Sequence, residues 1–139
     1  MIYLVDTNVW LERLLNQDKS TEVGKFLDFI PAQELAISDF SLHSIGIILD
    51  RLGKLDAFEV FVDDLITNGN VLFVNLQPEK TKDIVVVVKE YGLDFDDAYQ
   101  IVASKELNAS LVSYDSDFDK TNLKRVTPEE VIRLRKVSS

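Results

Sequence analysis

The sequence predicts an α/β fold in which a short, mostly parallel sheet of four to five strands lies between two layers of helices. Apolar runs of three or four residues recur along the chain, and they alternate with longer segments in which apolar residues have helical spacing. The runs do not alternate with polar residues, which indicates strands buried on both faces. A chain of 139 residues suits a single domain, over 1–139.

The first half of the chain contains two expected strands, over residues 2–5 and 35–37. Ser20 or Thr21 can cap the second helix, which Pro31 ends, because a proline cannot continue a helix. Each of the two strands is followed by a pair of helical segments. These helices are expected over 7–15, 20–30, 39–52 and 55–67.

The second half of the chain supplies strands over 71–74 and 111–113, with Val126 in a last short strand. Thr127-Pro128-Glu129-Glu130 has the pattern of a capping box, with a proline in the first helical turn. This pattern begins a final helix. Two more helices are expected over 78–91 and 96–107.

The ends of these two helices carry local signals. Pro78 suits a first helical position, and Gly92 closes the same segment. Asp94 or Asp96 can cap the helix that follows. Residues 84–88 are all β-branched, which alone favours a strand, but the length and the flanking caps favour a helix.

The composition excludes several kinds of chemistry. Without cysteine, the chain cannot form disulfides, cysteine zinc sites or a thiol nucleophile, and one histidine does not build a histidine metal site or triad. No apolar run approaches the roughly 20 residues of a membrane span, so a cytoplasmic protein with no membrane partner is expected. The net charge of −9 argues against nucleic-acid binding by bulk attraction, although residues 120–139 hold six bases and two acids.

Aspartates follow the strands where the site of a parallel sheet is expected. Asp6 comes directly after the first strand, Asp97 lies at the start of a helix, and Asp115 and Asp117 follow the strand at 111–113. Each alone is explained as a helix cap or a turn residue. Two carboxylates about 4 Å apart repel by roughly 4 kcal/mol at an effective dielectric of 20, so a converging set needs a cation. Oxygen ligands favour Mg²⁺ or Mn²⁺.

These residues carry a family resemblance. Val5-Asp6-Thr7-Asn8-Val9 after an initial strand resembles the opening of PIN-domain ribonucleases. Asp96-Asp97-Ala98 is similar to the family's aspartate–alanine helix start, and Ser113-Tyr114-Asp115-Ser116-Asp117-Phe118 is similar to its late strand and acidic turn. The ending over 126–130 also resembles the family. The order and spacing of the motifs look most like the VapC-like toxins of toxin–antitoxin pairs.

The resemblance implies a PIN-like three-layer fold and an endoribonuclease that uses Mg²⁺ or Mn²⁺ on an RNA substrate. It further implies a homodimer and a small antitoxin protein as partners. Carried over residue by residue, Asp6, Asp97 and Asp115 match metal-binding and catalytic acids of the family. Asp117 matches a further metal-binding acid. Asn8 and Ser113 match polar residues that would orient these acids.

One position departs from the family pattern. Ser44 stands where the family usually has a glutamate, early in the helix after the second strand. Asp39 lies five residues earlier, and His43 would point about 100° away, so neither falls naturally on the same helix face. Weaker metal binding, recruitment of Asp39 or His43, and loss of catalysis all remain open. A PIN-like module that binds protein or RNA without cutting is therefore the alternative to a ribonuclease.

Other readings of the sequence are weaker. An acidic-pocket phosphatase or a signalling receiver would want a second acid close after the first strand, and Asn8 stands there. Trp10 could stack on a base, but a core position is expected for it. Tyr99 and Tyr114 flank the expected site and can equally be packing residues. For the basic end of the chain, a solvated helix is expected over an RNA-binding patch.

Overall fold

The central sheet of the protein has the predicted parallel arrangement. In the computed structural model, which describes residues 1–138, the sheet contains four strands in the order β3-β2-β1-β4. β1 pairs with β2 through Tyr3 and Leu35, and with β4 through Tyr3 and Ser110. The strands are β1 (Tyr3–Val5), β2 (Leu35–Ser38), β3 (Leu72–Val74) and β4 (Ser110–Val112). β1 is thus an inner strand with parallel partners from both halves of the chain.

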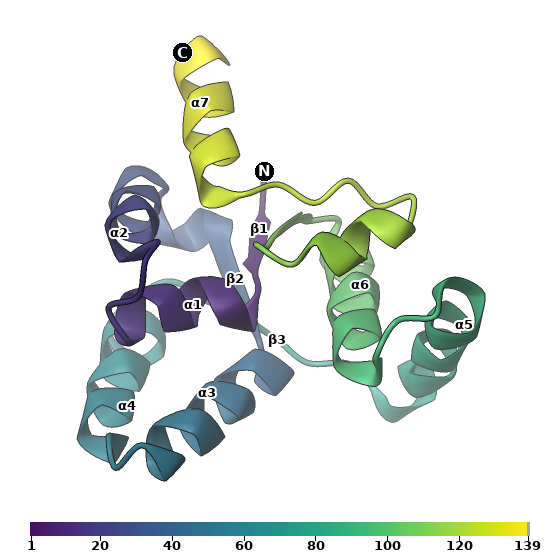
Figure 1. Ribbon diagram of the computed structural model, residues 1–139, viewed down its shortest axis with the longest axis horizontal. Helices are drawn as coiled ribbons and strands as arrows, with labels where there is room; N and C mark the ends of the chain where they lie inside the picture. Colours follow the sequence, from purple (N-terminus) through teal and green to yellow (C-terminus); the bar gives the residue numbers. More distant parts are fainter. Residues whose placement is uncertain (139) are drawn as a thin grey trace.

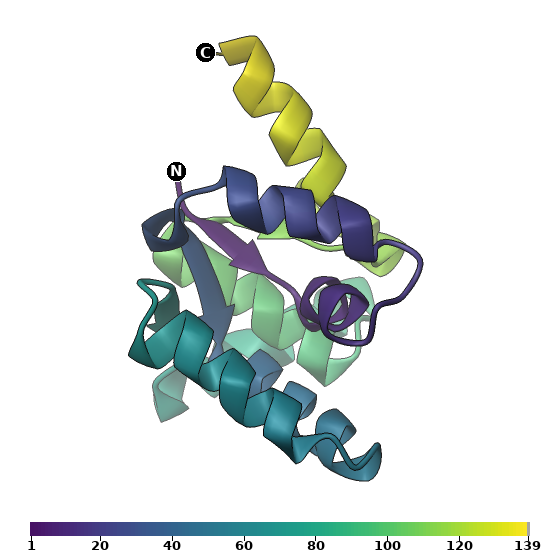
Figure 2. The same cartoon turned by 90° about the vertical axis from the view of Figure 1, so that its left-hand side faces the viewer.

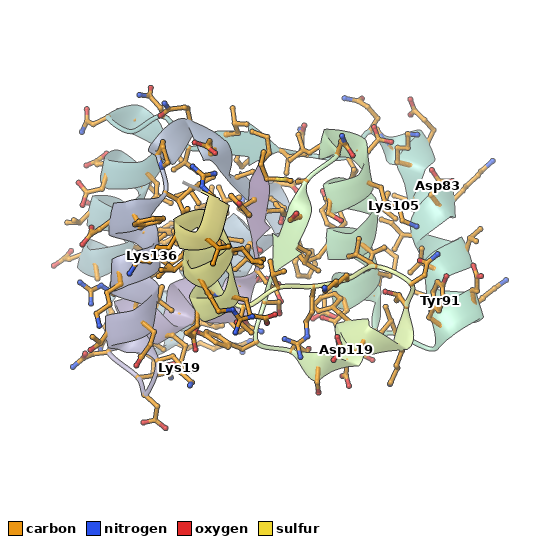
Figure 3. The ribbon with its side chains drawn as sticks, turned by 90° about the horizontal axis from the view of Figure 1, so that it is seen from above. Lys19, Asp83, Tyr91, Lys105, Asp119 and Lys136 are labelled. Carbon is orange, nitrogen blue, oxygen red and sulfur yellow. The ribbon has the colours of Figure 1, made fainter. Side chains whose placement is uncertain are left out.

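Helices cover both faces of the sheet, as the sequence predicts (Figure 1). One face packs against α1 (Thr7–Leu14), α2 (Ser20–Phe29), α3 (Asp39–Arg51) and α4 (Leu55–Val62). The other packs against α5 (Thr81–Tyr91) and α6 (Phe95–Leu107). Seen from above, Lys19 beside α2 lies on one side of the strands, and Lys105 of α6 and Asp83 of α5 lie on the other (Figure 3).

The helix α7 (Pro128–Ser138) packs its first turn against the body through the buried Val131 and then projects away from it (Figure 2). Its start is the capping box that the sequence predicts. The Thr127 amide donates to Glu130 Oε1 at 3.2 Å, and the Glu130 amide donates to Thr127 Oγ1 at 3.2 Å. Each of the two side chains therefore satisfies one backbone donor at the start of the helix.

Two apolar cores follow from the alternation of side chains along the strands. Tyr3 and Val5 point into the core under α1 to α4, whereas Leu4 between them points into the core under α5 and α6. The β-branched run of α5 is helical because Ile84 and Val87, three residues apart, bury one face against α6. Tertiary packing therefore overrides the strand propensity of this run.

The boundaries differ from prediction at several points. Val126 forms a single parallel bridge to Val112 and no strand. Lys19, not Ser20 or Thr21, occupies the N-cap of α2, and its amide donates to Glu12 Oε2 at 3.0 Å, so that Ser20 enters the helix and is buried. The remaining differences concern short turns of other helical types. Pro78–Lys80 is a 3-10 turn before α5, and Asp63–Thr67 is a π-helical turn after α4.

Two further observations complete the fold. Asp94 holds the N-cap position of α6 without a side-chain cap hydrogen bond, whereas Asp96 Oδ1 accepts the Asp97 amide at 3.0 Å. Over residues 1–138, the helices are all too short or too polar to cross a membrane.

Candidate active site

A pocket opens beyond the carboxyl ends of β1 and β4, where the strand order reverses direction in the sheet. Such a switch point is where parallel α/β sheets place their ligands. The pocket has a volume of about 320 Å³. Acidic side chains come from the end of β1, the start of α6 and the turn after β4, while α3 supplies neutral ones. The lining residues are Asp6, Thr7, Asn8, Leu11, Phe40, Ser44, Ile48, Asp96, Asp97, Gln100 and Asp115.

Asp6 is the most deeply buried acid of the pocket, with 6% of its surface exposed. It is the N-cap of α1, and its Oδ1 accepts the Thr7 amide at 2.9 Å. Gln100 Nε2 donates to the same oxygen at 2.9 Å, and Ser113 Oγ donates to Oδ2 at 2.8 Å. Burial raises the pKa of Asp6, and these three hydrogen bonds lower it in part. Asp6 is thus at once a helix cap and a pocket acid.

Ser113 and Asn8 link Asp6 to the turn after β4. The fully buried Ser113 hydroxyl donates to Asp6 and accepts the Asp115 amide at 3.0 Å and Asn8 Nδ2 at 3.2 Å. Asn8 Oδ1 in turn accepts the Tyr114 amide at 3.3 Å. The hydroxyl therefore uses its single donor and both lone pairs. This arrangement fixes the position of Asp115 relative to Asp6.

Three carboxylates lie close together, and two of them, Asp97 and Asp115, line the pocket. Asp97, Asp115 and Asp117 each place a carboxylate oxygen within 4.8 Å of the others. Asp117 is exposed, and its amide donates to Asp115 Oδ1 at 2.9 Å, so the turn holds the two acids together. Desolvation, followed by the charges of Asp115, Asp96, Asp6 and Asp94, raises the pKa of Asp97 to about 7. The crowding of negative charge is the feature that a cation would relieve.

The donor set fits a hard divalent cation. Its members are carboxylate oxygens without sulfur or imidazole, which suits Mg²⁺ or Mn²⁺ better than zinc. Asp97, Asp115 and Asp117 form the cluster that could hold the ion, and Asp6 lines the same pocket from β1. Asp94, Asp96 and Asp97 form a second acidic group at the start of α6, of which Asp94 and Asp96 are exposed.

Gln100 is a site residue that the sequence analysis missed. It is 2% exposed and contacts three elements: its Nε2 donates to Asp6 and to Ser41 Oγ at 2.7 Å, and its Oε1 accepts Ser38 Oγ at 2.8 Å. It lies three residues after Asp97, on a helix whose surrounding residues are apolar and buried. A polar residue at this spacing from a site acid is the signal that could have revealed it.

The pocket contains Ser44 but neither residue that could substitute for a glutamate. Asp39 lies outside the lining and accepts hydrogen bonds from the Tyr99 hydroxyl and the Phe40 amide. His43 is exposed and lines a separate hollow between α3 and α4. The structure therefore does not bring either of them to the acids, and the α3 side of the pocket is uncharged.

The three aromatic residues near the expected site have partners within the fold. Trp10 is 2% exposed, packs edge-on against Phe61, and donates its indole N–H to the Val5 carbonyl at 3.1 Å. Desolvation and its bond to Asp39 raise the pKa of Tyr99 to about 12. The hydroxyl of Tyr114 donates to Glu129 at 2.6 Å. Neither tyrosine lines the pocket.

Bases near the end of the chain form ion pairs within it. Lys120 pairs with Asp117, Arg125 with Asp119, and Arg135 with Glu34. The labelled Asp119 marks the turn after β4 in Figure 3. This pairing reduces the positive charge that the basic end offers to a phosphate backbone.

The sequence and the fold were compared with known proteins. The family model of the PIN domain matches residues 3–124. A comparison with curated proteins finds no match.

Solved structures of similar fold cover nearly the whole chain. A toxin–antitoxin complex from Klebsiella pneumoniae is 20% identical with a TM-score of 0.72, covering 91% of this chain and 97% of that chain. The sarcin–ricin loop cleaving toxin VapC20 of Mycobacterium tuberculosis is 16% identical with a TM-score of 0.75, covering 91% and 99%. FitAcB from Neisseria gonorrhoeae is 19% identical with a TM-score of 0.69, covering 92% and 99%. At these identities the likeness shows a shared fold.

Proposed function

Because the chain belongs to the PIN domain family, we propose that it is a metal-dependent endoribonuclease that hydrolyses RNA phosphodiester bonds. We propose that it is the toxin of a toxin–antitoxin pair, acting in the cytoplasm as a single-domain homodimer that a small antitoxin protein silences. A similar fold described as a toxin–antitoxin complex, and another described as a sarcin–ricin loop cleaving toxin, support this proposal.

The observation that carries the proposal is the convergence of Asp6, Asp97 and Asp115, from three distant segments, in one pocket at the switch point of the sheet. Roles as helix caps or turn residues do not explain why three buried or half-buried acids share one pocket. Each ionised acid raises the free-energy cost of ionising the others. A bound cation offsets that cost. The arrangement therefore favours metal-assisted hydrolysis over a single-aspartate phosphoryl site.

The residues in and around the pocket have different roles in the proposed reaction. Asp97, Asp115 and Asp117 would hold Mg²⁺ or Mn²⁺, with Asp6 behind them. When bound, the cation activates a water and stabilises negative charge on the phosphodiester. Ser113 and Asn8 orient Asp6 and the Asp115 turn. Since the net charge is −9, RNA must be held by local geometry and by the ion.

Asparagine variants test the proposal. We expect Asp6→Asn, Asp97→Asn and Asp115→Asn each to abolish RNA cleavage in Mg²⁺ or Mn²⁺, because each removes a charge from the pocket. The matched control is Asp18→Asn, an exposed residue between α1 and α2, which should cleave like the wild type. Cleavage is followed on a mixture of structured RNAs with EDTA as the metal-free reference. Metal-loaded protein that leaves all of these RNAs intact would contradict the proposal.

A second candidate function is a module that binds RNA or protein without cutting, and Ser44 is the observation that favours it. Ser44 lines the pocket at the position where the family resemblance expects a glutamate, and no acid replaces it on the α3 side. If the wild type is inert, we expect Ser44→Glu to restore metal-dependent cleavage. His43→Glu, one residue away and outside the pocket, is the matched control and should remain inert.

A further inference from the structure

Gln100 holds Asp6 through an amide whose orientation follows from its neighbours. Asp6 Oδ1 can only accept when ionised, so the end of the amide that faces it is Nε2. The opposite end is Oε1, which accepts the proton of Ser38 Oγ at 2.8 Å, while the same Ser38 oxygen accepts the Ser41 amide at 3.0 Å. Both N–H groups are used, one by Asp6 and the other by Ser41 Oγ.

This amide stands where a cation on the inner side of Asp6 would have to bind. N–H donors place partial positive charge against Oδ1, so a divalent ion at that oxygen would be repelled by Gln100. On the α3 side, the lining residues Phe40, Ser44 and Ile48 offer no carboxylate to hold such an ion. The cluster of carboxylates lies instead on α6 and the turn after β4.

We propose that Gln100 is a positioning residue that stabilises the Asp6 carboxylate in place of a cation, so that the pocket takes a single divalent ion at Asp97 and Asp115. The number of ions rests on the proposed metal-dependent function. The positioning of Asp6 by Gln100 does not, because it depends only on the hydrogen bonds of the chain. In this pocket, a cation would thus stabilise the negative charge of Asp97 and Asp115, and the Gln100 amide stabilises the negative charge of Asp6.

Gln100→Glu tests the proposal, because it keeps the shape and replaces Nε2 by a carboxylate oxygen 2.9 Å from Asp6 Oδ1. In EDTA at pH 8, we expect the melting temperature of this variant to fall by about 5 °C or more. Mn²⁺ should restore it, since the new pair of carboxylates forms a second ion site. Titration with Mn²⁺, followed by calorimetry, should give one ion per chain for the wild type and two for the variant.

Two further variants separate charge from packing. Gln33→Glu adds the same charge at an exposed position, and we expect the wild-type melting temperature and one bound Mn²⁺. Gln100→Leu removes both N–H donors without adding a carboxylate. It should be destabilised in EDTA, and Mn²⁺ should stabilise it by no more than it stabilises the wild type. Rescue by Mn²⁺ that is particular to Gln100→Glu is a result that a merely structural role would not produce.

The outcomes distinguish this inference from the proposed function. Two Mn²⁺ ions per wild-type chain, or Gln100→Glu with wild-type stability in EDTA, would overturn the inference. If Gln100→Glu does not fold in EDTA but folds on addition of Mn²⁺, the inference is supported. Wild-type protein that binds no Mn²⁺ would overturn the metal-dependent function and the single-ion site. The EDTA comparison of Gln100→Glu with Gln33→Glu would still decide whether Gln100 positions Asp6.

Discussion

Asp97→Asn should make the metal-free protein more stable, although the same change removes a proposed catalytic acid. The carboxylate oxygens of Asp97, Asp115 and Asp117 lie within 4.8 Å of one another. At that distance a pair of charges repels by about 3.5 kcal/mol at an effective dielectric of 20 and about 1 kcal/mol in water. Because Asp97 is half-buried and Asp117 exposed, the lower value applies, and two pairs give about 2 kcal/mol. Losing an acid at the start of α6 costs about 0.5 kcal/mol, which leaves about 1.5 kcal/mol.

The effect depends on pH in a defined direction. The pKa of Asp97 is raised to about 7 in the folded protein, whereas an unfolded aspartate titrates near 3.8. A raised pKa in the folded state contributes stability that is fully present below about pH 4 and is lost as the pH rises through 7. The Asp97→Asn variant does not lose stability in this way as the pH rises, because an asparagine side chain does not ionise. Its advantage over the wild type should therefore be absent at pH 4, partial at pH 6 and complete at pH 8.

Urea unfolding in EDTA at these three pH values measures the effect, and the same series in saturating Mn²⁺ provides the internal check. An ion bound to the folded state stabilises the wild type, so the order of the two proteins should reverse in Mn²⁺. Asp18→Asn controls for the loss of one charge from an acidic protein. An Asp97→Asn protein no more stable than the wild type at pH 8 in EDTA would refute the reasoning from carboxylate crowding.

Two further predictions concern side chains that support the fold and the pocket. Ser113→Ala should lower the free energy of unfolding by about 2 to 4 kcal/mol in urea, because it removes the buried hydroxyl that donates to Asp6 Oδ2 and accepts the Asp115 amide; a loss under 1 kcal/mol would contradict this. Thr127→Ala should lower it by about 1 kcal/mol, since it removes the hydroxyl that caps the Glu130 amide. Thr127→Ser, which keeps the hydroxyl, should unfold close to the wild type.

Local sequence signals predicted most of the fold. Apolar runs located the four strands, and the capping box at Thr127 located the start of α7. The expected burial of the strands on both faces is wrong for β3, because it lies at the edge of the sheet and exposes Leu72 and Phe73. The end of a strand also placed Asp6 and Asp115 at one edge of the sheet, since parallel strands share their carboxyl ends. Asp6 caps α1 and also lines the pocket, and the two are compatible because its two oxygens have different partners.

Contacts between distant segments could not be predicted in this way. Gln100 and Asp6 are 94 residues apart. No local sequence pattern predicts that the Gln100 side chain forms hydrogen bonds with Asp6 after β1, with Ser38 of β2 and with Ser41 of α3. The same limit explains why the prediction for Ser20 is wrong, since local sequence preferences favour it as the N-cap of α2. The Lys19 amide at the start of α2 donates to the side chain of Glu12 instead, and Ser20 is buried beside Arg13.

The position of β1 has a consequence for the order in which the molecule is made. β1 is made before the other three strands of the sheet, and one of its two partners, β4, follows more than a hundred residues later. Asp97, Gln100 and Ser113, which face or flank Asp6, are also translated late. A nascent chain that has completed only β1 to β3 therefore carries Asp6 without most of its surroundings. The pocket can assemble only after β4 has been made, and the pairing of β1 with this distant strand is a step at which folding should be slow.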